Sequence, residues 1–141
     1  MRIIIVVGLA LLTAGCGRST DDWLRQLRDP DVVRRRQAIR ELGSKTGDAE
    51  RVVAALTEAL RDDSSYVRHD AATTVAKFGA AAGPAAPLLV RLLEDRELSV
   101  RKAAEAALQR IDPDAVAKRS TADAPVRKND PKTKGKGAPR R

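Results

Sequence analysis

A unit of 33 residues recurs three times in this chain, and this repetition constrains the fold more than any other sequence feature. Aligned without gaps at that spacing, residues of the same kind fall into six columns. Six matching columns in three successive copies indicate stacked structural repeats, since a single copy could not bury its apolar face alone. The columns are Trp23/Leu56/Leu89, Leu27/Leu60/Leu93, Asp29/Asp62/Asp95, Arg35/Arg68/Arg101, Ala38/Ala71/Ala104 and Leu42/Val75/Leu108.

Each unit has the pattern of a helix, a turn and a second helix. In the clearest copy, the third, Pro84 is expected at the first position of a helix that runs to about Glu94. A second helix follows from about Glu97 to Ile111, with apolar residues at intervals of three and four. Aromatic residues make up only 2% of the chain and alternating strand patterns are missing, so a sheet protein is excluded and an all-α fold is predicted.

The other two units carry helix signals of their own. In the middle unit, Asp48 is a candidate cap for a first helix, and Asp63 or Ser64 for a second helix that ends near Gly79. The first unit departs from the pattern, because Arg34 occupies the column of Val67 and Val100. Either this is an atypical terminal repeat with a polar outer face, or the register shifts locally.

These residues resemble HEAT repeats, especially the short bacterial type. The resemblance lies in Leu93-x-Asp95 followed by Val100-Arg101-x-x-Ala104 and Leu108, and it covers residues 22–114. It implies a short α-solenoid of three helix pairs with a protein-binding concave surface. It also implies a structural ladder of aspartate and arginine side chains, a role that suits bidentate Arg–carboxylate pairing. The ladder residues are Asp29, Asp62, Asp95, Arg35, Arg68 and Arg101.

The second helices would line the concave surface, and their outward positions are the expected partner-binding residues. Three of them occupy one column of the repeat, and the other four are polar neighbours on the same helices. These residues are Arg36, His69, Lys102, Arg40, Thr73, Glu105 and Gln109.

The N-terminus predicts export and a lipid anchor. After Met1-Arg2, residues 3–12 form an apolar run of about ten residues, which suits a signal peptide and is too short to span a bilayer. Ala14-Gly15-Cys16 resembles a bacterial lipobox, so residues 1–15 are expected to be cleaved. Cys16, in a short tether over residues 16–21, would carry the lipid. The alternative is an ordinary signal peptide with an incidental cysteine. Gly17, in place of aspartate, favours the outer membrane facing the periplasm.

The charge of the chain is concentrated at its C-terminus. Residues 3–117 contain 17 basic and 17 acidic side chains, whereas residues 118–141 contain nine basic and two acidic ones. The segment 115–141 is therefore expected to be a disordered basic tail beyond the repeat domain. Residues 118–141 either keep the protein soluble or bind an anionic surface of the cell envelope.

The sequence offers no evident catalytic constellation, metal site or cofactor site. The single histidine, His69, falls in the column of Arg36 and Lys102, and Cys16 is the only cysteine. The expected function is a non-catalytic, membrane-anchored module that binds an unidentified protein. The alternatives are an accessory subunit or an enzyme resembling the HEAT-like bilin lyases, and, less favoured, a nucleic-acid-binding protein. Neutral repeats with few aromatic residues argue against nucleic acid.

Overall fold

The computed structural model describes residues 18–122, and the predicted signal peptide with Cys16 lies outside them. The described chain is helical throughout and contains no strand. Its α-helices are α1 (Thr20–Gln26), α2 (Val32–Leu42), α3 (Ala49–Ala59), α4 (Ser65–Val75), α5 (Ala86–Leu92), α6 (Leu98–Ile111) and α7 (Pro113–Ala122), and its 3-10 segments are η1 (Thr46–Asp48) and η2 (Ala76–Ala85).

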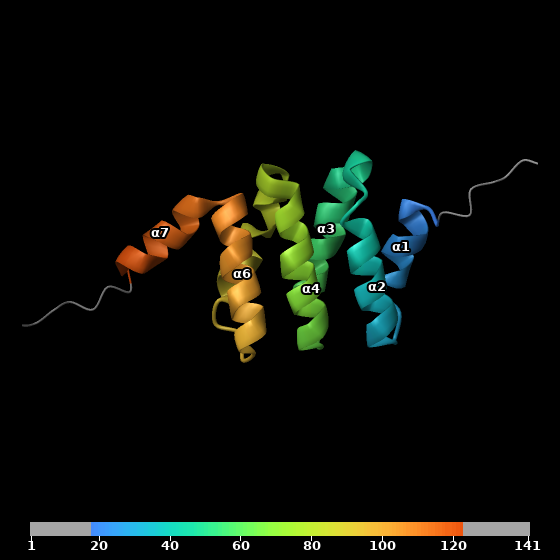
Figure 1. The fold of residues 1–141 in the computed structure, drawn as a ribbon, viewed down its shortest axis with the longest axis horizontal. Coiled ribbons are helices and arrows are strands. Elements are labelled where there is room, and N and C mark those ends of the chain that lie inside the picture. The colour runs from blue at the N-terminus through green and yellow to red at the C-terminus, as the bar shows by residue number, and fades with distance from the viewer. Residues whose placement is uncertain (1–17, 123–141) are drawn as a thin grey trace, which may run out of the picture.

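The helices form two layers, as expected for a solenoid of three helix pairs. Helix α1 packs against α2, α3 against α4, and α5 against α6. The second helices α2, α4 and α6 stand side by side and run in the same direction, with α3 behind them (Figure 1). The prediction of an all-α solenoid is therefore confirmed.

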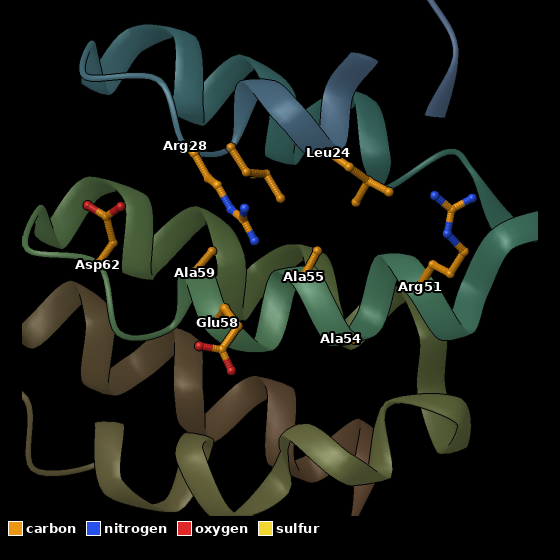
Figure 2. Close-up of a pocket in the computed structure, with 9 residues that line it drawn as sticks. Leu24, Arg28, Arg51, Ala54, Ala55, Glu58, Ala59 and Asp62 are labelled. Atoms are coloured by element: carbon orange, nitrogen blue, oxygen red, sulfur yellow. The ribbon is translucent and has the colours of Figure 1, made fainter. Parts of the chain in front are cut away.

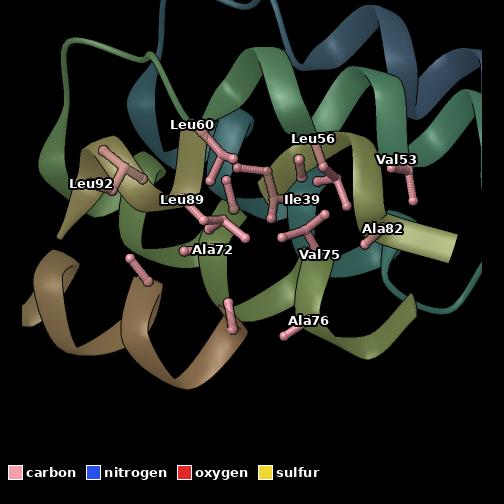
Figure 3. Packing of buried hydrophobic residues seen from close by; sticks show 14 of the residues in the cluster. Ile39, Val53, Leu56, Leu60, Ala72, Val75, Ala76, Ala82, Leu89 and Leu92 are labelled. Atoms are coloured by element: carbon pink, nitrogen blue, oxygen red, sulfur yellow. The ribbon is translucent and has the colours of Figure 1, made fainter. Parts of the chain in front are cut away.

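The repeated columns form the core between the two layers. Leu56 and Leu89, from one column, are fully buried, and so are Ala38, Ala71 and Ala104 from another. Figure 3 shows Leu56, Leu60 and Leu89 close to Ile39 and Val75 in this core. Alanine leaves no long side chain between neighbouring second helices, so the helices can approach closely while leucines fill the space behind them.

The connection between the second and third units differs from the expected one. Helix α4 ends at Val75 instead of continuing to Gly79, and α5 begins at Ala86, after Pro84. The ten residues between them form η2, which is interrupted at Gly79, where φ is 53°. Glycine adopts this left-handed conformation without the steric cost that a side chain would impose, so it allows the chain to turn inside the alanine-rich segment.

Disorder from residue 115 onwards was the wrong expectation for residues 115–122. Pro113 starts a new helix, α7, rather than only ending the previous one, because its fixed φ and missing N–H suit the first turn of a helix. The backbone N–H of Ala115 donates to the side chain of Asp112, and Ala115 and Val116 pack against the core. Residues 123–141 lie outside the described part of the chain.

Candidate functional site

Two bidentate ion pairs link the three units. The Nε and Nη2 atoms of Arg35 donate to the carboxylate of Asp62 at 2.8 and 2.9 Å. The same atoms of Arg68 donate to Asp95 at 2.8 and 3.0 Å. In each pair the arginine starts in one unit and the aspartate belongs to the next, so each pair joins neighbouring repeats. We call these two pairs the rungs.

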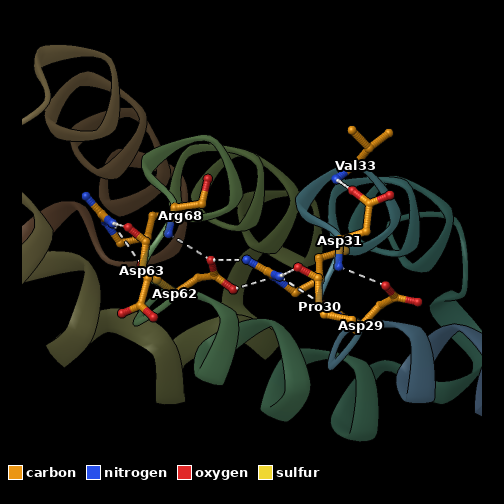
Figure 4. A network of polar contacts seen from close by, with 9 residues as sticks. Asp29, Pro30, Asp31, Val33, Asp62, Asp63 and Arg68 are labelled. Atoms are coloured by element: carbon orange, nitrogen blue, oxygen red, sulfur yellow. Dashed lines mark hydrogen bonds and ion pairs between the residues drawn. The ribbon is translucent and has the colours of Figure 1, made fainter.

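The third nitrogen of each arginine binds the turn of its own unit. Nη1 of Arg35 donates to the backbone carbonyl of Asp29, and Nη1 of Arg68 to that of Asp62, both at 2.8 Å (Figure 4). The aspartates also accept from the backbone at the start of the second helix. The N–H of Ser64 donates to Asp62 at 2.9 Å, and that of Glu97 donates to Asp95 at 2.9 Å. Each rung therefore fixes a turn, a helix start and a repeat interface.

The second rung is well shielded from solvent, because the side chains of Arg68 and Asp95 are 12% and 7% exposed. The hydrogen bond from Arg68 and the backbone N–H of Glu97 lower the pKa of Asp95, although burial opposes this effect. The same hydrogen bond raises the pKa of Arg68. Both charges are therefore stabilised in the folded protein by each other.

The outermost members of the predicted ladder, Asp29 and Arg101, do not enter a rung. Asp29 has no preceding unit, and its carboxylate accepts instead from Nη1 of Arg34 at 3.3 Å. Arg101 binds the carbonyls of Asp95 and Arg96 through Nη1, and no carboxylate of the described residues pairs with it. The ladder thus contains four of the six predicted residues in its rungs.

The exposure of Val33 and Arg34 decides whether the first unit is an atypical terminal repeat or is shifted in register. A shift in register would bury Val33, but Val33 is 66% exposed while Arg35 keeps its rung. Arg34 is 65% exposed at a position where Val67 and Val100 are buried. The first unit is therefore in register, and Arg34 serves as a polar cap at the end of the solenoid.

The predicted partner-binding residues lie on α2, α4 and α6. Arg36 and His69 are half-buried, and the other five are exposed. They share the surface formed by the second helices, which we call the second-helix surface. Their role in binding stays a prediction. The five exposed residues are Arg40, Thr73, Lys102, Glu105 and Gln109.

Sequence reasoning missed the polar cluster on this surface, which forms between α2 and α4. Arg36 donates from Nε to Asp70 at 2.8 Å, and its Cζ atom lies 5.4 Å from the centre of the Tyr66 ring. Arg40 and His69 also face the carboxylate of Asp70. Burial alone would raise the pKa of Asp70, but hydrogen bonds from Arg36 and His69 hold it below its usual value. Tyr66 itself remains 66% exposed.

A signal for this cluster was present in the sequence. Asp70 lies 34 positions after Arg36, one more than the repeat period, so the two side chains come from adjacent second helices at nearly the same height. The rungs use a different offset, 27 positions, because their aspartates lie in the turns. Counting offsets near the period, rather than only at it, would have found the pair.

The two layers differ in charge, although the repeats as a whole are neutral. Helices α2, α4 and α6 carry eight basic and three acidic residues, whereas α1, α3 and α5 carry three basic and four acidic ones. Two of the eight, Arg35 and Arg68, are neutralised by the rung aspartates, and the remaining six basic residues still outnumber the three acidic ones on the second helices. A surface with one prevailing sign of charge attracts partners of the other sign and guides their approach.

A cleft of about 600 Å³ lies on the other side, between α1 and α3. Its apolar part includes Leu24 and Ala55, and Arg28, Arg51 and Glu58 lie around it (Figure 2). Acidic and basic groups are mixed here, and Arg51 is engaged in an ion pair with Asp21. The geometry therefore gives no reason to place the main binding surface on this side.

No helix within residues 18–122 is long and apolar enough to cross a membrane. No three histidine, cysteine, aspartate or glutamate side chains in that range are grouped so that they could hold a metal ion.

Comparison with known proteins identifies the repeat. A family model described as HEAT repeats matches residues 20–109, which is more than half of the chain. No curated protein matches the chain. The matched range includes both rungs and all seven predicted partner-binding residues.

Removing the arginine of a rung is expected to destabilise the fold. Arg68→Ala should lower the free energy of unfolding by about 2–4 kcal/mol, because it leaves Asp95 partly buried without its charge partner. Arg101→Ala is the matched control, since Arg101 makes the same contacts to its own turn but has no rung. It should cost at least about 1 kcal/mol less. Urea denaturation measures both; equal costs would show that the rung adds nothing.

The rungs also predict how stability depends on pH. The folded state lowers the pKa of Asp95, so its contribution is complete above the unfolded pKa of about 4 and is lost as the pH falls through the folded value. Asp95→Asn should therefore be less stable than the natural protein at pH 7, with the difference shrinking as the pH falls below the unfolded pKa of about 4. Asp63→Asn, an exposed neighbour of the first rung, should change stability little. A constant difference for Asp95→Asn would exclude the ionised rung.

Proposed function

Because the chain belongs to the HEAT-repeat family, we propose that it is a non-catalytic interaction module that binds a protein through its second-helix surface and is anchored to a membrane at Cys16. HEAT repeats suggest a protein-interaction or scaffold module. The specific surface, the anchor and the cell envelope location form the rest of the proposal.

The observation that carries the proposal is the composition of the second-helix surface. It combines an excess of basic residues with an exposed aromatic ring, Tyr66, over which the guanidinium of Arg36 lies. Tyrosine and arginine are the residue types that contribute most to binding energy at protein interfaces. The ion pair with Asp70 limits the motion of Arg36 before a partner arrives, which lowers the entropy lost on binding. We therefore expect a partner with an acidic surface.

The proposed anchor is compatible with access to this surface. Ser19 caps α1 through a reciprocal pair of hydrogen bonds with Asp22, so only Gly17 and Arg18 separate Cys16 from the folded domain. Two extended residues span on the order of 7 Å, which would keep the domain close to the lipid. Because α1 and α2 are antiparallel, α1 starts at the edge where α2 ends, away from the rungs (Figure 1).

The basic segment 118–141 supports a second attachment in the same proposal. Its nine basic residues against two acidic ones would attract anionic lipid headgroups or envelope polymers. Such attraction would weaken as the salt concentration rises, because exposed charges are screened.

Photocrosslinking in intact cells tests the binding surface. Benzoylphenylalanine in place of Tyr66 should form a covalent adduct with a specific protein, because this position is exposed on α4, beside Arg36 of the second-helix surface. The same residue in place of Glu58, which is 75% exposed on α3, should form none. Combining Arg40→Glu with Lys102→Glu should reduce the Tyr66 adduct at least about tenfold, since two attractive charges become repulsive.

The proposed surface would be excluded if only the Glu58 position formed an adduct, or if the yield of the Tyr66 adduct were unchanged by the two charge-reversing substitutions. Cell fractionation in the same experiment addresses the anchor. The protein is expected in the membrane fraction labelled with palmitate, and Cys16→Ala should remove both the label and the membrane retention. Retention without Cys16 would contradict a lipid anchor.

A further inference from the structure

The solenoid ends differently on its two sides, and the C-terminal end carries an incomplete rung. In Arg35 and Arg68, the Nε and Nη2 atoms form the bidentate edge that holds the next aspartate. Arg101 has the same anchoring bonds through Nη1, at 2.7 and 3.0 Å to the carbonyls of Asp95 and Arg96. Its bidentate edge is therefore oriented by the same contacts, but no carboxylate within residues 18–122 occupies it.

The sequence does not continue the aspartate column. A fourth unit would place an aspartate 33 positions after Asp95, but that position is Lys128. No buried side-chain nitrogen or oxygen in the described part lacks a hydrogen-bond partner, so the free edge of Arg101 is accessible to solvent. Arg101 thus offers a placed and accessible receptor for a carboxylate.

An apolar side chain is uncovered beside this receptor. Leu98 lies one helical turn before Arg101 and is 54% exposed. Val32 and Ser65, which hold the same position in the first two units, are half-buried. Helix α7 packs against α6 through Ala115 and Val116 but leaves Leu98 exposed. A contact that covers Leu98 would bury apolar surface and pair the guanidinium at the same time.

The opposite end is closed against the same kind of contact. Arg34 binds Asp29 and replaces the valine that the other units bury at their interface. A second copy stacked on that end would have to displace Arg34 from Asp29 and cover its charge, which is costly. Head-to-tail association of identical chains is therefore disfavoured, and the C-terminal end remains available for a different protein.

We propose that the start of α6, with Arg101 and Leu98, is a docking site for a partner protein that presents an aspartate or glutamate in a turn after a helix, as Asp62 and Asp95 do within this chain. The partner's carboxylate binds Nε and Nη2 of Arg101, and an adjacent apolar side chain covers Leu98. Lys102 and Arg96, both exposed, add positive charge beside the site, while Glu97 at the helix start selects against additional acidic groups there. This site goes beyond the second-helix surface and can be tested without it.

A peptide with the sequence of residues 86–97, which contains the helix and turn that Arg68 binds, serves as the probe. Titrated into the full chain, it should shift the Nε–Hε signal of Arg101 and the methyl signals of Leu98 in nuclear magnetic resonance spectra. A peptide with Asn at the position of Asp95 should bind at least about tenfold more weakly, because one charged, bidentate contact is lost. Arg101→Lys, which keeps the charge but cannot form the bidentate pair, should reduce this discrimination.

Arg110→Ala, which removes an exposed basic residue at the other end of α6, is the control variant and should retain the preference for the aspartate peptide. Equal binding of the two peptides, unchanged discrimination in Arg101→Lys, or no shift at Arg101 would overturn the proposal. Sedimentation of the full chain tests whether a second copy of the chain occupies the site instead. A monomer is expected. Self-association that is abolished by Asp29→Asn would show that Arg101 binds Asp29 of another copy. Failure of the Tyr66 crosslink would leave these results unaffected, so the two proposals fail separately.

Discussion

One arginine in each of the first two units holds three parts of the solenoid together. The arginine is part of the second helix of its own unit, and its Nη1 atom donates to backbone carbonyls of the turn in that unit. Its Nε and Nη2 atoms donate to the aspartate of the next unit. The aspartate in turn accepts from the start of the helix that follows it. Because each unit contacts its neighbours through such repeated interfaces, the rungs add to the apolar core in coupling the three units.

The same constraint explains the two ends. An aspartate without a preceding arginine needs another cation, and Arg34 supplies it at the cost of the valine found in the other units. An arginine without a following aspartate keeps its anchoring bonds but has an open edge. The first unit thus ends the solenoid with an exposed ion pair, whereas the third unit is covered in part by α7. The two ends therefore differ in chemistry.

Much of this could be predicted from the sequence because the repeat supplies its own internal comparison. Three copies in register identified the core columns, the rung residues and the exposed face of the second helices. The two residues of the first rung could be predicted as ladder members, since Arg35 and Asp62 each occupy an invariant column of the three units. The pairing of each arginine with the following unit required coordinates, because the columns are equally consistent with pairing inside one unit.

The features that were missed do not repeat. The cluster of Arg36, Tyr66 and Asp70 occurs once, at a single interface, so comparing columns at the exact repeat period could not show it. Helix α7 follows a proline that can either end one helix or start another, and only packing of Ala115 and Val116 decides between these outcomes. The η2 segment depends on a left-handed Gly79, a backbone property that the residue type permits but does not require.

A double-mutant cycle on the first rung tests the central claim most directly. The free energies of unfolding of the natural protein, Arg35→Ala, Asp62→Ala and the double variant give the coupling energy between the two side chains. A rung that joins the units predicts a coupling of at least about 1.5 kcal/mol. A coupling near zero would show that the two side chains stabilise their own turns independently, and that apolar packing alone holds the repeats together.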